Sequence, residues 1–318
     1  MPTLHPQAQA FVDAMSAQPG RRETHQLTPA EARLGYRLLA QLMGAGPEVG
    51  EVREDALPGP AGPIPVRLYR PVGPGPFGVL VYYHGGGWTI GDLETHDKEC
   101  RILCQDGHRV VVSVDYRTAP EHQFPAAVED AWAALTGVVA RTADLEATPA
   151  RIAVGGDSAG GNLAAVVAQM ARDAGGPALD LQLLIYPAVD VREDAPERYL
   201  SRRENAAGPI LLADTMAYFV SHYLGEANPD RTDPRLSPLL APSLAGLPPA
   251  LVLTAECDPL RDEGLAYAAA LRAAGGTVRH VTYAGMPHAF FQFSPVFDAG
   301  REALAECASA LREPQLIG

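Results

Sequence analysis

The 318-residue chain carries 25 basic and 38 acidic side chains, which give a net charge of −13, and 47% of its residues are hydrophobic. That length and apolar content suffice for one large domain with an embellishment. The net negative charge argues against nucleic acid or an anionic membrane surface as a partner, because both need a basic face on the protein.

The first segment, residues 1–46, has helical patterns. Phe11, Val12 and Met15 share a helical face, and Thr28-Pro29-Ala30-Glu31 combines the N-cap, first-turn proline and N3 glutamate of a helix start. No signal-peptide pattern precedes them, and no apolar run in the sequence approaches the roughly 20 residues that span a bilayer. We therefore expect a cytoplasmic protein without membrane partners, in which this segment forms the N-terminal part of a helical cap.

Short apolar runs then alternate with helical patterns across residues 47–186 and 246–318. Strands are expected at Val49–Glu54, Ile64–Tyr69, Val79–Tyr83, Val110–Val114, Arg151–Val154, Leu181–Tyr186, Leu251–Thr254 and Val278–Tyr283. The first two flank a Pro/Gly-rich turn at residues 57–65, which is typical of an antiparallel start. Parallel strands joined by helices predict an α/β core with a mostly parallel sheet of about eight strands, flanked by helices.

Residues 187–245 do not fit this alternation and are expected to form a second cap segment. Leu212, Met216, Phe219, Val220 and Tyr223 lie on one helical face. That apolar face must cover another part of the molecule.

A glycine-rich loop, His84-Gly85-Gly86-Gly87-Trp88, follows the strand at Val79–Tyr83. Its glycines leave backbone N–H groups bare, and such groups can stabilise the oxyanion of a tetrahedral intermediate. A flexible turn and a phosphate cradle are alternatives. The phosphate loop is disfavoured because no Gly-Lys-Ser/Thr follows and the only lysine in the sequence is Lys98.

The sequence Gly156-Asp157-Ser158-Ala159-Gly160 follows the strand at residues 151–155 and opens a helical pattern. Strand, glycine-flanked serine and amphipathic helix in that order predict a nucleophile elbow, which exposes the hydroxyl of Ser158. Without partners, the serine could equally be an ordinary helix cap. The residue that follows it, Ala159, would add a backbone N–H to the oxyanion hole.

The partners that a serine nucleophile needs occur later in the chain. An acid-rich turn, residues 256–264, follows the strand at 250–255, and a histidine, His288, follows the last strand. We assign Asp258 as the acid, with Glu256 as its rival, because Asp262 and Glu263 lie inside the next helix. In this assignment His288 takes the serine proton, and the acid fixes its tautomer and stabilises the cation.

Four motifs together resemble the hormone-sensitive-lipase-like family of bacterial carboxylesterases. They are His84–Gly87, DYRTAPEH at residues 115–122, GDSAGGN at residues 156–162 and DPLRDEG at residues 258–264. The resemblance spans Val66 to Arg312 and is nearest the branch with aspartate in the nucleophile motif. Thr118 departs from the leucine that is usual there, and nothing catalytic depends on it.

The resemblance implies an α/β-hydrolase fold with two cap segments over the active site. It also implies the catalytic triad Ser158, Asp258 and His288, an oxyanion hole formed by Gly86, Gly87 and Ala159, and a scaffold role for His84. Relatives of this kind often dimerise through the last strand, so a homodimer through Thr277–Tyr283 is expected.

Aromatic residues near the motifs predict a narrow substrate pocket. Trp88 follows the oxyanion glycines and Phe290 lies two residues after the base, while Met216, Phe219 and Tyr186 are weaker candidates for the pocket wall. We therefore expect the partner to be a small ester with a short to medium acyl chain.

Three functions remain open on the sequence. A serine carboxylesterase and an amide or formamide hydrolase would use the same triad. A non-catalytic receptor on a hydrolase scaffold is a third, disfavoured because nucleophile, acid and base are all present. The sequence has no His-Glu-x-x-His motif or tight ligand cluster, so neither a metal nor another cofactor is expected. Its four cysteines are too few for a disulfide framework in so long a chain and are expected to pack.

Overall fold

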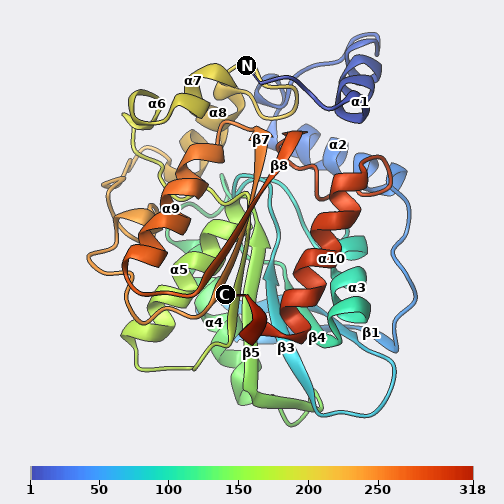
Figure 1. Cartoon of the computed structure of the whole chain (residues 1–318), viewed down its shortest axis with the longest axis vertical. Coiled ribbons are helices and arrows are strands. Elements are labelled where there is room, and N and C mark those ends of the chain that lie inside the picture. The colour runs from blue at the N-terminus through green and yellow to red at the C-terminus, as the bar shows by residue number, and fades with distance from the viewer. Residues whose placement is uncertain (1, 318) are drawn as a thin grey trace.

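Eight strands form one sheet in the order β1-β2-β4-β3-β5-β6-β7-β8 in the computed structural model, which describes residues 2–317 (Figure 1). The strands are β1 Glu51–Gly59, β2 Gly62–Arg70, β3 Phe77–Tyr83, β4 Arg109–Val114, β5 Ala147–Asp157, β6 Leu181–Ile185, β7 Ala250–Cys257 and β8 Val278–Pro287. β1 pairs antiparallel with β2, and β2 pairs antiparallel with β4. The remaining pairs are parallel, which confirms the predicted sheet.

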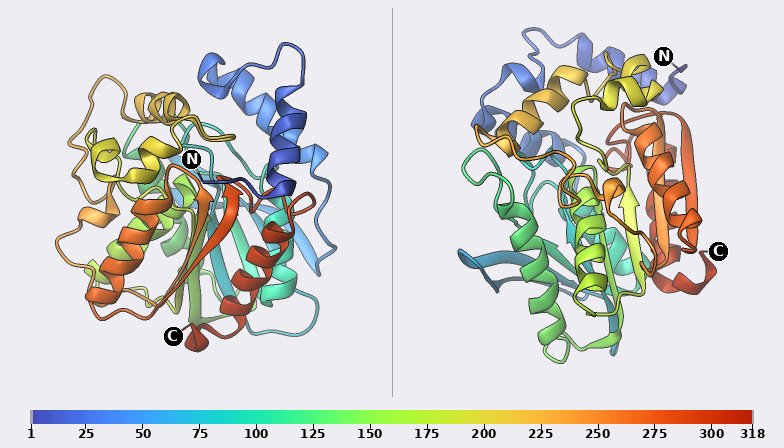
Figure 2. Two further views of the ribbon diagram at one scale, coloured as in Figure 1. Left: turned by 45° about the horizontal axis from the view of Figure 1, so that its top comes forward. Right: turned by 90° about the vertical axis from the view of Figure 1, so that its left-hand side faces the viewer.

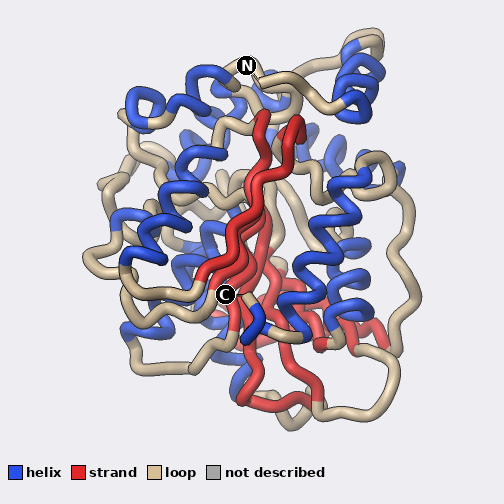
Figure 3. The backbone as a smooth tube through the Cα atoms, in the orientation of Figure 1, coloured by secondary structure: helices blue, strands red, loops and turns tan. Residues whose placement is uncertain are grey.

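Long helices cover both faces of the sheet (Figures 1 and 3). α3 Asp97–Gly107 and α10 Asp298–Arg312 lie on one face, and α4 Ala126–Ala140, α5 Ala159–Asp173 and α9 Arg261–Ala273 lie on the other. Successive residues of a strand point to opposite faces. Accordingly, Val79 and Val81 of β3 join one hydrophobic core while Leu80 and Tyr82 join the other, and all four are fully buried.

A further group of helices lies over the end of the sheet at which the parallel strands finish (Figure 2). They are α1 Pro6–Ser16, α2 Pro29–Leu42, α6 Ala195–Arg198, α7 Leu200–Glu204 and α8 Ala213–Leu224, with 3-10 turns at Thr24–Gln26, Pro238–Leu240 and Pro314–Leu316. The predicted start of α2 is confirmed. Thr28 is its N-cap, and Glu31 accepts a hydrogen bond from the Thr28 N–H at 2.9 Å. The predicted face of residues 212–223 belongs to α8 and its N-cap residue.

The turn predicted at residues 57–65 is wrong, because both strands continue into it. Leu57 pairs with Ile64 and Gly59 with Gly62, which leaves only residues 60 and 61 outside the strands. The extension buries Leu57 and Ile64 to 3% exposure in the hydrophobic core. Pro58 is tolerated because β1 is an edge strand.

All four cysteines are buried thiols. Within residues 2–317, no helix is both long enough and apolar enough to cross a bilayer.

Candidate active site

Ser158 lies on a strained turn between β5 and α5. Its φ of 56° and ψ of −116° are unusual for a residue with a side chain. The turn needs glycine on both sides, since a Cβ at Gly156 would lie 2.3 Å from the Tyr83 carbonyl oxygen and one at Gly160 only 1.9 Å from it. The backbone therefore has the geometry of a nucleophile elbow.

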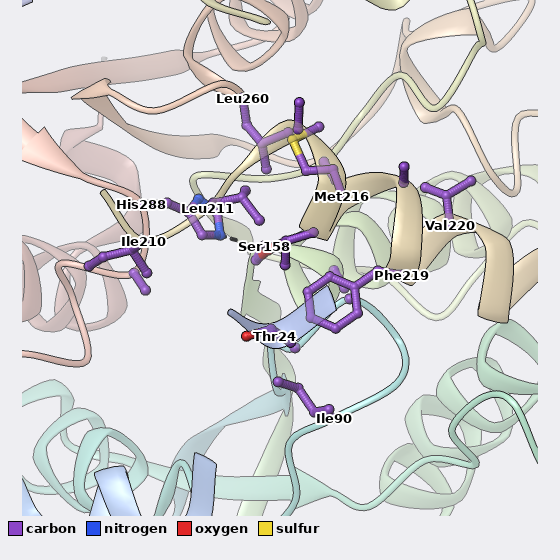
Figure 4. Close-up of a pocket in the computed structure, with 18 of the residues that line it drawn as sticks. Thr24, Ile90, Ser158, Ile210, Leu211, Met216, Phe219, Val220, Leu260 and His288 are labelled. Atoms are coloured by element: carbon purple, nitrogen blue, oxygen red, sulfur yellow. Dashed lines mark hydrogen bonds between the residues drawn. The ribbon is translucent and has the colours of Figure 1, made fainter. Parts of the chain in front are cut away.

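Hydrogen bonds connect the aspartate, the histidine and the serine, and Figure 4 shows the one between His288 and Ser158. His288 Nε2 lies 3.0 Å from Ser158 Oγ, and His288 Nδ1 lies 2.7 Å from Asp258 Oδ2. The other carboxylate oxygen of Asp258 accepts the Leu260 N–H at 2.9 Å. Asp258 is fully buried and His288 is 7% exposed, so the structure brings these three predicted residues together in a site shielded from bulk water.

The rival acids are engaged elsewhere. Glu256 accepts the Gly285 N–H at 2.7 Å, and Asp262 accepts the Ser201 N–H at 2.8 Å. Glu263 pairs with Arg202, yet burial raises the pKa of Glu263 to about 7. The carboxylate at His288 is that of Asp258.

Gly86, Gly87 and Ala159 all line one cavity, together with Ser158. No acceptor for the backbone N–H groups of Gly86, Gly87 and Ala159 appears among the hydrogen bonds of residues 2–317. The Gly86 carbonyl turns away and accepts the N–H of Ile90 at 2.9 Å, and Gly87 has a φ of 57°. Ala159 is the first residue of α5, whose dipole favours negative charge at this point. The arrangement can stabilise an oxyanion.

His84 lies behind the glycines as a buried support. Burial lowers the pKa of His84 to about 4, so the imidazole is neutral near pH 7. The ring stacks on Tyr116 with centroids 4.2 Å apart, and Nδ1 lies 2.8 Å from the Gly85 oxygen.

A cavity of about 490 Å³ opens above the serine, between the helices α1, α2, α6, α7 and α8 and the strand ends. The predicted residues Trp88, Met216 and Phe219 contribute to its wall. A further group of wall residues was not predicted: Thr24, Ile90, Ile210, Leu211, Val220 and Leu260 (Figure 4). Two of these had a sequence signal: Val220 lies on the apolar face of α8, and Leu260 lies within the motif at residues 258–264. The others lie in turns and connecting segments without periodicity.

Tyr186 and Phe290 do not line this cavity, which corrects their assignment. Tyr186 directly follows β6 with a φ of 34°, and its ring centroid lies 4.6 Å from that of His288. Phe290 is fully buried, with its ring 5.8 Å from Tyr186 and 4.8 Å from Tyr283. The Tyr186 ring thus packs directly on the histidine, and Phe290 packs on Tyr186.

Among residues 2–317, no group of three or more His, Cys, Asp or Glu side chains is arranged to hold a metal ion.

Comparison with known proteins identifies the family. Residues 80–292 match the model of a family described as having the alpha/beta hydrolase fold. The chain belongs to the α/β-hydrolase family. This hydrolase is 47% identical over 287 residues to the carboxylic ester hydrolase LipN of Mycobacterium tuberculosis, covering 88% of this chain and 75% of that protein. It is 39% identical over 256 residues to an ethyl acetate hydrolase of Pseudomonas putida, covering 79% of this chain and 78% of that protein.

Solved structures agree with the family assignment. An α/β-hydrolase enzyme from the metagenome of Lake Arreo, Spain, superimposes with a TM-score of 0.93 at 43% identity, over 98% of this hydrolase and 99% of that chain. The hyperthermophilic esterase of Pyrobaculum calidifontis has a TM-score of 0.93 at 42% identity over the whole of both chains. These relatives place the hydrolase in the hormone-sensitive-lipase-like branch that its motifs predicted.

Proposed function

We propose that this α/β hydrolase is a serine carboxylesterase. The observation that carries the proposal is the hydrogen-bonded chain from Asp258 through His288 to Ser158, which ends at a cavity with three uncommitted backbone N–H groups. Relatives named carboxylic ester hydrolase and ethyl acetate hydrolase support the ester as the substrate class.

Acylation follows from the geometry. Ser158 Oγ attacks the ester carbonyl carbon while His288 Nε2 accepts the hydroxyl proton, and Asp258 stabilises the imidazolium through Nδ1–H. The carbonyl oxygen becomes an anion and accepts hydrogen bonds from the oxyanion-hole N–H groups. When the intermediate collapses, the ester C–O bond breaks and the alcohol leaves with the proton from His288.

Deacylation repeats the same proton transfers with water. His288 Nε2 removes a proton from the water as its oxygen attacks the acyl carbon, and then returns a proton to Ser158 Oγ. The products are the carboxylic acid and the free serine.

The cap is proposed to shape the acyl site. Residues 1–46 and 187–245 would form the cap, and residues 47–186 and 246–318 the catalytic core. Phe219 supports a preference for short to medium acyl chains, because its ring fills the space next to the oxyanion loop. The ring packs so closely on Gly87 that a Cβ added to this glycine would lie 2.2 Å from a ring carbon. The cavity wall is mainly apolar, which suits an acyl chain.

The test is hydrolysis of p-nitrophenyl esters from acetate to palmitate by the wild type, Ser158→Ala and the control Ser309→Ala. Ser309 lies exposed on α10, away from the cavity. We expect the wild type and the control to cleave short esters and Ser158→Ala to be inactive. Activity that rises toward palmitate would contradict the acyl preference, and a wild type that cleaves only the matching p-nitroanilides would favour an amidase.

A homodimer is proposed through the sheet edge near Thr277–Tyr283. β8 ends the sheet order, and its residues Arg279 and Thr282 are exposed, so an unpaired edge is available. Light scattering should give the mass of a dimer for the wild type and of a monomer for Thr282→Pro. The cytoplasmic location expected from the sequence stays a prediction, which fractionation of the native host would test.

A further inference from the structure

A second buried polar cluster lies behind the glycine-rich loop and has no part in the chemistry described above. Its centre is His96, the residue before α3, which is fully buried. His96 Nε2 lies 3.1 Å from Asp157 Oδ1, 3.2 Å from the Gly85 nitrogen and 2.5 Å from the side-chain amide of Gln292. Polar groups buried so completely are costly unless they are paired, so this arrangement calls for an explanation.

His96 and Asp157 form a buried ion pair. Burial by itself lowers the pKa of His96, but the carboxylate of Asp157 outweighs burial and leaves that pKa raised. Glu99 and Asp92 act in the same direction. Burial likewise raises the pKa of Asp157, and His96 more than reverses this, with help from the Tyr82 hydroxyl. The two groups therefore stabilise each other's charged form.

A hydrogen bond to Thr95 fixes the orientation of the His96 ring. His96 Nδ1 lies 2.9 Å from Thr95 Oγ1. The single hydroxyl hydrogen of Thr95 is directed to the Asp92 carbonyl oxygen at 2.9 Å. Nδ1 is therefore the donor to Thr95. The other ring nitrogen, Nε2, faces the Asp157 carboxylate, the Gly85 N–H and the Gln292 amide.

The ion pair holds the loop that carries the oxyanion donors. Asp157 Oδ1 accepts the Gly85 N–H at 2.9 Å, and Gly85 directly precedes Gly86. The loop packs closely on the carboxylate, since a Cβ at Gly85 would lie 2.3 Å from Asp157 Oδ2. Asp157 is also the residue before Ser158. One carboxylate thus connects the oxyanion loop to the nucleophile elbow, and His96 fixes that carboxylate.

The cluster also reaches the cap. The Tyr36 hydroxyl of α2 donates to Gln292 Oε1 at 2.7 Å, and the Gln292 amide contacts His96. Tyr36 and Gln292 both line the cavity above Ser158. The main-chain oxygen of Gln292 is held in turn by Lys98 Nζ at 2.7 Å.

We infer that His96 is a positioning residue, which holds the oxyanion-hole loop in place relative to Ser158 and connects it through Gln292 to Tyr36 of the cap. The inference rests on the proposed esterase function. Oxyanion donors act only within a narrow range of positions, and a displacement of about 1 Å can cost 100-fold in rate. A loop position set by the ion pair should therefore affect the transition state more than substrate binding.

The test compares His96→Gln with the control His280→Gln on a short p-nitrophenyl ester. His280 is a half-buried histidine on β8 that contacts Thr254 at 2.9 Å, far from the loop in the sheet order. We expect His96→Gln to lower kcat by about 10- to 100-fold with KM changed less than threefold, and the control to behave as wild type. Affinity for a trifluoromethyl ketone, which forms an oxyanion on the serine, should fall in parallel with kcat.

Two further variants keep the inference testable if His96→Gln does not fold. Tyr36→Phe retains the ring and loses only the hydroxyl, and we expect kcat to fall about two- to fivefold with unchanged KM. Asp157→Asn should resemble His96→Gln, and the double variant should lose less than the product of the two effects.

The outcomes separate this inference from the proposed function. A folded His96→Gln or Tyr36→Phe with wild-type kcat and wild-type ketone affinity overturns the positioning role while leaving the esterase assignment intact. A wild type that hydrolyses no ester overturns the proposed function itself, before any variant is compared.

Discussion

The loops at the strand ends and the helices above them are built differently. His84, Gly85, Gly87 and Trp88 of the oxyanion loop are buried, and the strand before them is buried at every position. By contrast, α1 and α2 each bury a single alanine, and Leu34, Leu38 and Leu42 of α2 are 61%, 52% and 79% exposed. Segments with few buried contacts open more easily than a core.

This difference in packing implies that the two regions have different functions. The groups that perform the reaction are held by backbone packed against backbone, as at Gly160 and the Tyr83 carbonyl. The cavity above them is bounded by segments that are attached through fewer buried side chains. Substitutions in the strand-end loops should therefore change kcat, whereas substitutions in the cap should change which esters are accepted.

The largest effect is expected for Asp258→Asn. The amide cannot hold His288 in the required tautomer or stabilise its cation, so kcat should fall about 10⁴-fold. Steady-state hydrolysis of a short p-nitrophenyl ester measures this fall in kcat. The control is Glu256→Gln, which alters the other acid at the end of β7 and should leave kcat within about threefold of wild type, because Glu256 contacts Gly285 and not the histidine. Equal losses in both variants would contradict the assignment.

A large effect is also expected for Gly160→Ala. Alanine suits a helix better than glycine, but here its Cβ would lie 1.9 Å from the Tyr83 carbonyl oxygen, so the elbow must shift. We expect kcat/KM to fall at least about 100-fold. The control is Gly137→Ala on α4. There the new Cβ would lie 3.4 Å or more from the Leu57 side chain, which is an ordinary van der Waals contact. That variant should retain activity and gain about 0.4–1 kcal/mol in unfolding free energy.

A moderate effect is expected for Phe219→Ala in α8. Removing the ring enlarges the cavity beside Gly87, so relative kcat/KM should shift toward longer acyl chains by about tenfold. Activity on the acetate ester should change much less. The ratio of octanoate to acetate hydrolysis measures the shift, with Asp214→Asn as the control, because Asp214 is an exposed residue of the same helix outside the cavity lining. An unchanged ratio would show that Phe219 does not limit chain length.

The smallest effect is expected for Leu38→Gln on the exposed face of α2. Its side chain is 52% exposed, so the free energy of unfolding should stay within about 0.5 kcal/mol of wild type. Leu80→Ala in β3 removes a fully buried side chain and should cost about 2–5 kcal/mol. Urea denaturation measures the free energy of unfolding of both variants. Similar losses would mean that α2 is packed as firmly as the sheet.

The sequence predicted those parts of the fold that depend on local patterns. All eight strands were located because their apolar runs end at Gly, Pro or polar residues, and the start of α2 was readable from Thr28 and Glu31. The triad residues were identifiable because each follows a strand, and parallel strands end at the same edge of a sheet.

The sequence could not supply contacts that depend on side-chain direction or on distant segments. Tyr186 looked like a pocket residue, but its positive φ directs the ring under His288. His96 and Gln292 are 196 positions apart, and neither belongs to a periodic pattern. The strands β1 and β2 were underestimated because Pro and Gly signals outweighed the alternation that buries Leu57 and Ile64.

The sole lysine of the sequence, Lys98, has a practical consequence for handling this protein. Its side chain is 10% exposed and its ammonium group is bound to the Gln292 oxygen and to Glu99. Across residues 2–317, amine-directed dyes, crosslinkers and aldehyde supports thus meet no accessible lysine. Immobilisation or labelling is better directed at the carboxylates, which are plentiful on the surface of a chain with 38 acidic residues.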